Sequence, residues 1–324
     1  DVYKRQAPQF VVQQTDGAPS DPVSLPVITS SLAKLEIHDG ELKIANANDP
    51  PWLQVSSMDG EISSRTGKHA GYLKAVKGQA ELPGRKELSF GGLQIDFEIA
   101  SQKLSITHAR IETAGSHLQA QGEMTSISPL AVDLDLDYRL GQEVANELAA
   151  ELNLSGALEG QAHLTTDDEG LDGEASFRST QISSPLFGSW SVDGKLSLQG
   201  SEVEVSQLRF QGHGGTVSAH GRLDFERQSH ALEADLSSLD VAALSGVWVE
   251  DSFPIASFLD GQVHLTLEGS DIGAVRGNAQ LTLRPRQAEG SIPLSGRMEL
   301  TGGAEEIVFR SDDLSMPFVQ ASVR

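Results

Sequence analysis

Strict alternation of apolar and polar residues is the feature that most constrains how this chain can fold. Val132, Leu134, Leu136 and Tyr138 alternate with charged residues, and the same period of two returns in many short segments between glycine, serine or asparagine. Successive side chains of a β-strand point to opposite faces, so each segment predicts a strand with one apolar face. Sheets with one face exposed to solvent are typically antiparallel. The sequence therefore predicts a mostly β protein with an antiparallel sheet.

Composition limits the classes of partner. The hydrophobic fraction is 38 %, and the 32 glycines bring the sequence close to the globular norm. The net charge of −22 argues against nucleic-acid binding, because phosphate backbones would be repelled. There is no cysteine, which removes disulfides, thiol nucleophiles and thiolate metal sites. No run of about 18 apolar residues is present, so we expect no membrane-spanning helix.

Two kinds of local signal interrupt the alternation. Asp39-Gly40 lies between two alternating runs and predicts a tight hairpin turn, because Asp-Gly suits a type I′ turn. Residues 141–152 place Val144, Leu148 and Leu152 at helical spacing. Residues 239–246 repeat this pattern more weakly. We therefore expect one or two short helices among the strands.

The chain contains an internal repeat. Gly160–Thr165 returns almost unchanged as Gly261–Thr266, so the repeat is about 100 residues long. Repeat arrays are quasi-linear rather than closed globules. Residues 1–6 resemble sequencing-adapter read-through, so we expect the true N-terminus to be missing. The predicted organisation is an irregular segment over 1–31, a β repeat over 32–140, a helix plus β repeat over 141–238, and a truncated one over 239–324.

The apolar side of the strands is the candidate functional surface. One interpretation is the dry core of a β-sandwich. The other is an open groove whose lining holds acyl chains, which need only continuous apolar surface. The predicted lining residues are Leu93, Ile95, Phe97, Leu104, Ile106, Val132, Leu134, Leu136, Val203, Val205, Val263, Leu265, Leu267, Leu281 and Leu283.

An acidic strand invites a calcium interpretation. Asp133, Asp135 and Asp137 have the spacing that begins an EF-hand loop. That loop needs glycine at its sixth position and glutamate at its twelfth, where this chain has Tyr138 and Val144. We therefore expect a solvated strand face rather than a calcium site.

Other candidate sites also favour structural roles. His163 and His264 occupy matching places in the repeat and are expected on the polar face, without the further ligands that a metal requires. Gly212–Gly215 lacks the Lys-Ser/Thr of a phosphate-binding loop and predicts a turn or bulge. No catalytic constellation is evident, so we expect no enzyme activity, no cofactor and no metal.

Four degenerate motifs carry a family resemblance. They are Leu-x-Ile-x-x-Gly-x-Leu at 35–42, the Leu-x-Ile…Gly-Ser-x-Leu-x-Ala-x-Gly pattern at 104–122, Leu-x-Gly-x-Leu-x-Gly at 154–160, and Phe-x-Gly-His-Gly-Gly…Gly-x-Leu at 210–223. In this order and spacing they resemble the AsmA-like and TamB-type proteins of diderm bacteria. The resemblance extends from residue 32 to the C-terminus.

The resemblance implies a fold and a function. The fold would be an elongated antiparallel sheet curled into a trough, in the periplasm of a Gram-negative bacterium and anchored to the inner membrane by an N-terminal helix missing here. Its role would be phospholipid transport to the outer membrane, with an outer-membrane β-barrel protein as a possible partner. The alternative is a structural or adhesive β-repeat protein of the cell envelope, with a dry core and no lipid.

Overall fold

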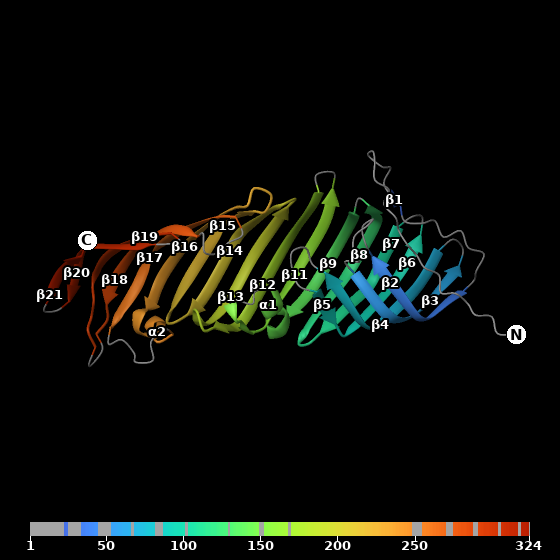
Figure 1. Ribbon diagram of the computed structural model, residues 1–324, viewed down its shortest axis with the longest axis horizontal. Coiled ribbons are helices and arrows are strands. Elements are labelled where there is room, and N and C mark those ends of the chain that lie inside the picture. Colours follow the sequence, from blue (N-terminus) through green and yellow to red (C-terminus); the bar gives the residue numbers. More distant parts are fainter. Residues whose placement is uncertain are drawn as a thin grey trace. The chain divides into compact units, whose positions relative to one another are not determined.

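The protein is mostly β, with antiparallel strands and two short helices (Figure 1). The computed structural model describes residues 23–24, 34–44, 53–65, 68–81, 87–100, 103–128, 130–148, 152–167, 170–247, 255–269, 275–287, 291–303, 306–316 and 319–323. The predicted fold class is confirmed at this level. The irregular segment predicted over 1–31 lies outside the described residues, apart from 23–24.

The chain forms two compact units. Unit 1 comprises residues 1–150 and 161–169, and unit 2 comprises residues 151–160 and 170–324. Each unit is larger than one predicted repeat, and the repeat boundaries stay predictions. Neither sheet is closed or strongly curled, so the trough implied by the resemblance is not seen within either unit.

In unit 1 the strands pair mostly in chain order. β2 pairs with β3, β3 with β4, and β4 with both β5 and β6. β6 to β9 follow in sequence, and β1 pairs with β8. The strands are β1 (Val23–Ser24), β2 (Lys34–Ile44), β3 (Leu53–Arg65), β4 (Lys68–Glu81), β5 (Glu87–Phe90), β6 (Gly92–Ala100), β7 (Lys103–Thr113), β8 (Ser116–Ser128) and β9 (Leu130–Leu140). β11 (Leu158–Asp167) pairs with β9 and is divided between the units.

In unit 2 the strands from β12 onward pair with their neighbours in sequence, and Figure 1 shows them side by side. β10 pairs with β12. The strands are β10 (Ser155–Gly156), β12 (Gly170–Ser184), β13 (Gly188–Gln199), β14 (Glu202–Gly212), β15 (Gly215–Asp224), β16 (Ser229–Asp240), β17 (Ser257–Glu268), β18 (Arg276–Pro285), β19 (Gly296–Gly302), β20 (Ile307–Met316) and β21 (Val319–Val323).

The hairpin predicted at Asp39-Gly40 is wrong. β2 continues through these residues, and its register against β3 shifts between Ile37 and Gly40. Asp39 has a φ of 51°, whereas Gly40 is not among the residues with positive φ. A type I′ turn needs positive φ at both central residues, and one such residue instead produces a bulge within the strand.

The two helices follow matching strands. α1 (Gln142–Leu148) begins directly after β9, and α2 (Val241–Ser245) begins directly after β16. Asp240 caps α2, because its side chain accepts a hydrogen bond from the Ala242 amide at 3.0 Å. Both helices lie within the predicted segments 141–152 and 239–246, although α1 ends at Leu148 and residues 149–151 lie outside the described residues. Among the described residues, no helix has the length and apolar character needed to cross a membrane.

The strand register reproduces the repeat. β6 and β7 shift register between Asp96 and Phe97, and β13 and β14 shift between Lys195 and Leu196, about 100 residues later. β7–β8 and β14–β15 carry a second matching bulge. A bulge adds an unpaired residue and bends the strand. The series β6 to α1 and β13 to α2 are therefore two copies of one local design.

Candidate functional site

In unit 1 the predicted lining residues share one face of the sheet. Directly opposed residues of neighbouring strands lie on the same face. Phe97 of β6 opposes Ile106 of β7. Gly122 of β8 lies between Ile106 and Leu134 of β9. This register and the alternation along each strand place Leu93, Ile95, Phe97, Leu104, Ile106, Val132, Leu134 and Leu136 on what we call the apolar face of unit 1.

In unit 2 the remaining predicted residues also share one face. Gly221 of β15 opposes Val205 of β14 on one side and Leu232 of β16 on the other. Leu232 in turn opposes Leu265 of β17, and Gly261 opposes Leu281 of β18. The apolar face of unit 2 thus includes Val203, Val205, Val263, Leu265, Leu267, Leu281 and Leu283.

Most side chains of the two apolar faces are only partly buried. Phe97 and Val132 are 7 % and 8 % exposed, but Leu265 is 39 % exposed. Residues sandwiched between two sheets would be buried as core residues are. Every described strand belongs to the pairing series above, so within the described residues no separate second sheet covers either face. The faces are therefore apolar surfaces with partial access to water.

Glycines let large neighbours lie flat on the apolar faces. A Cβ at Gly78 would overlap the ring of Phe90, and one at Gly194 would overlap the ring of Phe177. A Cβ at Gly60 would meet the Leu73 side chain at 2.7 Å. Glycine in a strand often marks such a close approach. Large side chains therefore fill the space over the glycines, which makes the apolar faces flatter.

In unit 2 the end of the apolar face beside α2 is closed. Trp190 is 8 % exposed, its Nε1 donates to the Phe187 carbonyl at 2.7 Å, and its ring lies 4.9 Å from that of His213. The His213 carbonyl accepts from the Asp240 amide at 2.8 Å, which ties the turn to the start of α2. Leu239, just before α2, is 3 % exposed.

Unit 1 closes the matching end with different groups. The β7–β8 turn contacts the start of α1 through Ser116, whose hydroxyl accepts from the Gly141 amide at 2.7 Å. A Cβ at Gly141 would meet the Gly115 carbonyl oxygen at 2.6 Å, so the turn and helix are in close contact. Val144 of α1 is 5 % exposed. In both units, the turn and the helix together cover one end of the face.

The opposite end of the unit 2 face is open. His230 lies on this face, between Leu223 of β15 and Leu267 of β17 in the register. Phe225, in the β15–β16 turn, is 59 % exposed and lies 5.5 Å from the His230 ring, centroid to centroid. The exposure of the face to solvent therefore increases from the end beside α2 to the end at the β15–β16 turn.

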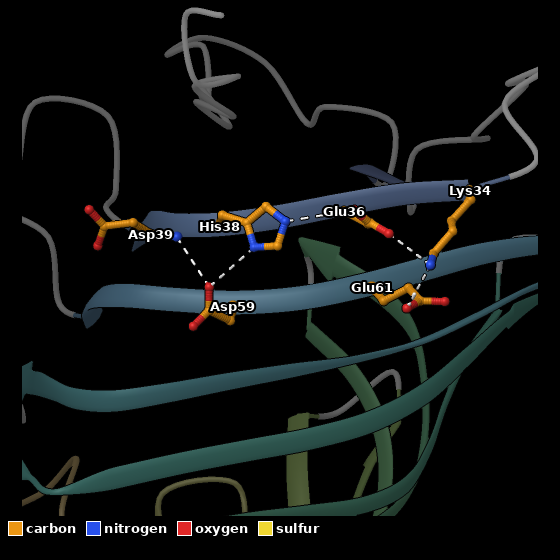
Figure 2. A network of polar contacts seen from close by, with 6 residues as sticks. All are labelled: Lys34, Glu36, His38, Asp39, Asp59 and Glu61. Atoms are coloured by element: carbon orange, nitrogen blue, oxygen red, sulfur yellow. Dashed lines mark hydrogen bonds and ion pairs between the residues drawn. The ribbon is translucent and has the colours of Figure 1, made fainter.

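The polar faces carry ion pairs. In Figure 2, Lys34 of β2 lies beside Glu36 and Glu61 at 2.8 and 3.1 Å, and Asp59 of β3 accepts from the Asp39 amide. The hydrogen bond to Glu36, and then that to Glu61, raises the pKa of Lys34. These side chains are well exposed, and exposed pairs contribute little to stability. They make β2 a charged strand with a bulge, which is how natural sheets discourage edge-to-edge association.

A second polar cluster joins β16, β17 and β18. Arg284 binds Asp260 through two nitrogens, at 2.5 and 3.0 Å, and also donates to the Ser238 hydroxyl at 2.9 Å. The hydrogen bond from Arg284 lowers the pKa of Asp260 and outweighs the opposing effect of burial. The guanidinium carbons of Arg284 and Arg286 lie 5.9 and 5.6 Å from the Phe258 ring. The charges in this cluster are largely paired with one another.

The other residues singled out in the sequence have ordinary surroundings. His163 Nδ1 lies 2.9 Å from the Asp135 carboxylate, and His264 faces Glu233 at 3.6 Å, so both histidines lie on polar faces as predicted. Gly212–Gly215 is the β14–β15 turn, as predicted. Asp133 opposes Glu123 on the polar face of unit 1. Within the described ranges, no three His, Asp or Glu side chains are grouped to hold a metal.

Comparisons with family models, with curated proteins and with solved structures find no match to this chain. The family resemblance of the four motifs therefore stays a prediction.

Sequence reasoning missed the residues that shape the ends of the unit 2 face. Trp190 was predictable from its alternation with Val192 and the following residues of β13. His230 interrupts an otherwise apolar alternation with Leu232, Ala234 and Leu236, and that interruption was the available signal.

Proposed function

We propose that this chain is a segment of a periplasmic bridge-like protein of the AsmA-like and TamB type, whose apolar faces carry phospholipid acyl chains between the inner and outer membranes. The observation that supports it most is the apolar ladder across neighbouring strands of each unit, which stays partly exposed. A ladder that crosses many strands gives an acyl chain continuous contact. Transport of this kind would support outer-membrane biogenesis.

The chemistry of the faces suits acyl chains. Burial of each CH₂ group contributes about 0.8 kcal/mol and requires no directional partner. Leu134 and Leu136 present aliphatic surface in unit 1, and Leu265 presents it in unit 2. Flat-lying side chains over glycine would let a chain slide along the face. No catalytic step or cofactor is part of this proposal.

The remaining parts of the proposal derive from the resemblance. The partners would be phospholipids, an outer-membrane β-barrel protein and an inner-membrane anchor, the last two through regions outside this chain. A trough would require the sheet to curl more strongly than it does within either unit. We propose that this curl develops over a longer array of repeats.

One observation favours the second candidate function, a structural or adhesive β-repeat protein of the cell envelope. Phe90 over Gly78 and Phe177 over Gly194 fill part of the apolar surface from within the sheet. Val55, Met58 and Ala75 join Phe90 in a buried cluster in unit 1. A face packed by its own side chains has less need of a ligand.

Mass spectrometry of the purified chain separates the two functions. The lipid proposal expects phospholipid to co-purify with the protein and to be removed by delipidation. Purified protein without phospholipid, which also fails to take up lipid from vesicles of phosphatidylethanolamine and phosphatidylglycerol, would favour the structural function.

Charged substitutions test the faces directly. Leu134→Asp in unit 1 and Leu265→Glu in unit 2 place a carboxylate on an apolar face, and we expect both to reduce lipid binding. Thr266→Glu is the matched control, because Thr266 is exposed on the other face of β17. Circular dichroism checks folding, since a charge on this face also costs stability. Equal lipid binding by Leu265→Glu and Thr266→Glu would contradict the proposal.

A further inference from the structure

A hollow on the polar face of unit 2 lies where β14 carries its bulge against β15. The register shifts between Val205 and Leu208, so two residues of β14 face only His220 of β15. The hollow has a volume of about 320 Å³, which is near the lower limit for ligand sites. Its exposed polar lining consists of Ser206, Gln207, Arg209, Ser218, His220 and Asp235. The bulge therefore gathers donors and acceptors from three strands in one place.

Arg209 carries a charge in this hollow that the protein does not pair. In unit 1 the register places Arg110 at the matching position, where its Nε donates to Glu112 at 2.7 Å. The residue of unit 2 that matches Glu112 is Gln211, which has no charge. Within the described residues Arg209 forms no ion pair, not even with Asp193, which opposes it on β13. Its guanidinium is therefore free to bind an anionic group, for which its fork of donors is suited.

The rest of the lining favours hydroxyl groups over a bare anion. Asp235 of β16 opposes Ser218, and Gln262 holds its carboxylate through a hydrogen bond from Nε2 at 3.0 Å. A carboxylate accepts hydrogen bonds from hydroxyl groups and repels other anions. The Ser206 hydroxyl donates to the Lys195 carbonyl at 3.3 Å, which leaves its lone pairs to accept from a ligand. A ligand with one anionic group and several hydroxyl groups therefore matches the hollow better than an anion alone.

We propose that this hollow binds an acidic saccharide, with the sugar carboxylate on the Arg209 guanidinium and the sugar hydroxyl groups donating to Asp235 and Ser206. The site lies on the polar face, so it goes beyond the proposed lipid function and does not depend on it. No covalent step is involved. The contacting groups are exposed to water, and we therefore expect weak binding, with a dissociation constant of about 1 mM.

Titration of the full chain with three probes, followed by nuclear magnetic resonance, tests the ligand class. Glucuronate has a carboxylate and hydroxyl groups, glucose has only the hydroxyl groups, and acetate has only the carboxylate. We expect glucuronate to bind at least about 5-fold more tightly than either of the others, which is the worth of one net hydrogen bond. Equal binding of glucuronate and acetate would overturn the saccharide as the ligand. Equal binding of glucuronate and glucose would overturn the role of Arg209, and no binding of glucuronate would overturn the site.

The difference between the units supplies the variants. Gln211→Glu gives unit 2 the glutamate that pairs with the arginine in unit 1, and it should lower the affinity for glucuronate about 5- to 10-fold, because the new carboxylate occupies the guanidinium of Arg209. Arg209→Gln should have the same effect. Arg110→Gln is the matched control and should change nothing, since Glu112 already pairs with that arginine. Unchanged binding of glucuronate by Gln211→Glu or by Arg209→Gln would overturn the assignment. None of the three side chains is buried, so the variants are expected to fold, which circular dichroism checks.

Discussion

The series β6 to α1 in unit 1 and β13 to α2 in unit 2 share their framework but differ where the apolar face ends. Both have the same two bulges, and Gly122 and Gly221 occupy matching places in β8 and β15. The end beside the helix differs, because unit 2 places Trp190 where the register of unit 1 has Gly91. Unit 1 instead joins turn to helix through the Ser116 hydroxyl.

The residues that fix the strand register differ from those that shape the surface of the apolar face. A Cβ at Gly122 would overlap the Asp133 carbonyl, and one at Gly221 would overlap the Ala231 carbonyl, so neither position has room for a side chain. Gly122 also has a φ of 140°, which side chains rarely adopt. Trp190 only fills the end of one face. The repeat therefore preserves strand pairing while it varies how far each face is open.

Trp190→Ala is expected to have the largest effect. Removal of a buried tryptophan costs about 3–5 kcal/mol. Hydrogen exchange followed by mass spectrometry should show lost protection in β13, β14 and α2, and unchanged protection in unit 1. Leu186→Ala, in the β12–β13 turn and 54 % exposed, is the control and should change little. Equal loss of protection in both units would contradict a role confined to unit 2.

Gly122→Ala and Gly221→Ala test the shared framework. We expect each to destabilise its own unit by about 2–3 kcal/mol, because the added methyl group overlaps a backbone carbonyl of the next strand. Gly200→Ala is the control, since a Cβ there meets nothing within 4 Å and only the φ of 58° opposes it. Urea unfolding monitored by peptide-level hydrogen exchange measures each unit. A smaller loss at Gly122 than at Gly221 would break the equivalence of the repeats, because Gly122 also carries the strain of a positive φ.

The sequence predicted the strands, the helices and the polar side of the sheet, because alternation and helical spacing are local signals. It failed at Asp39-Gly40, because the turn propensity of two residues was outweighed by the pairing of β2 along β3. The recurring Asp-Gly pairs at Asp59, Asp193 and Asp260 also lie inside strands, with glycine on the apolar face. The fit of one side chain over a glycine in the next strand depends on register, which no short segment reveals.

Ser116→Ala tests the contact between turn and helix in unit 1. The substitution leaves the Gly141 amide without its partner at 2.7 Å in a buried place, and we expect a loss of about 1–2 kcal/mol. Protection should fall in α1 and the end of β9. Ser206→Ala removes an exposed hydroxyl and is the control. In unit 2 the backbone carbonyl of His213 accepts the corresponding hydrogen bond, from the Asp240 amide. A substitution of the His213 side chain should therefore leave that hydrogen bond in place.

Asp260→Asn is expected to have the smallest effect, and it compares the polar faces of the two units. Arg284 lowers the pKa of Asp260 from its ordinary value of 3.8, so the stabilising contribution is fully present above that pH. It is lost as the pH falls through the lowered pKa of the folded state. The difference in urea midpoint between wild type and Asp260→Asn should therefore be constant from pH 7 to about 5 and should shrink as the pH falls below 3.8. Glu36→Gln in unit 1 removes an exposed partner of Lys34 and should give no measurable difference at any pH, because exposed pairs contribute little. A larger change in urea midpoint for Glu36→Gln than for Asp260→Asn would contradict this prediction. The ion pairs of Lys34 between β2 and β3 would then stabilise the protein more than the pair of Arg284 and Asp260 between β17 and β18.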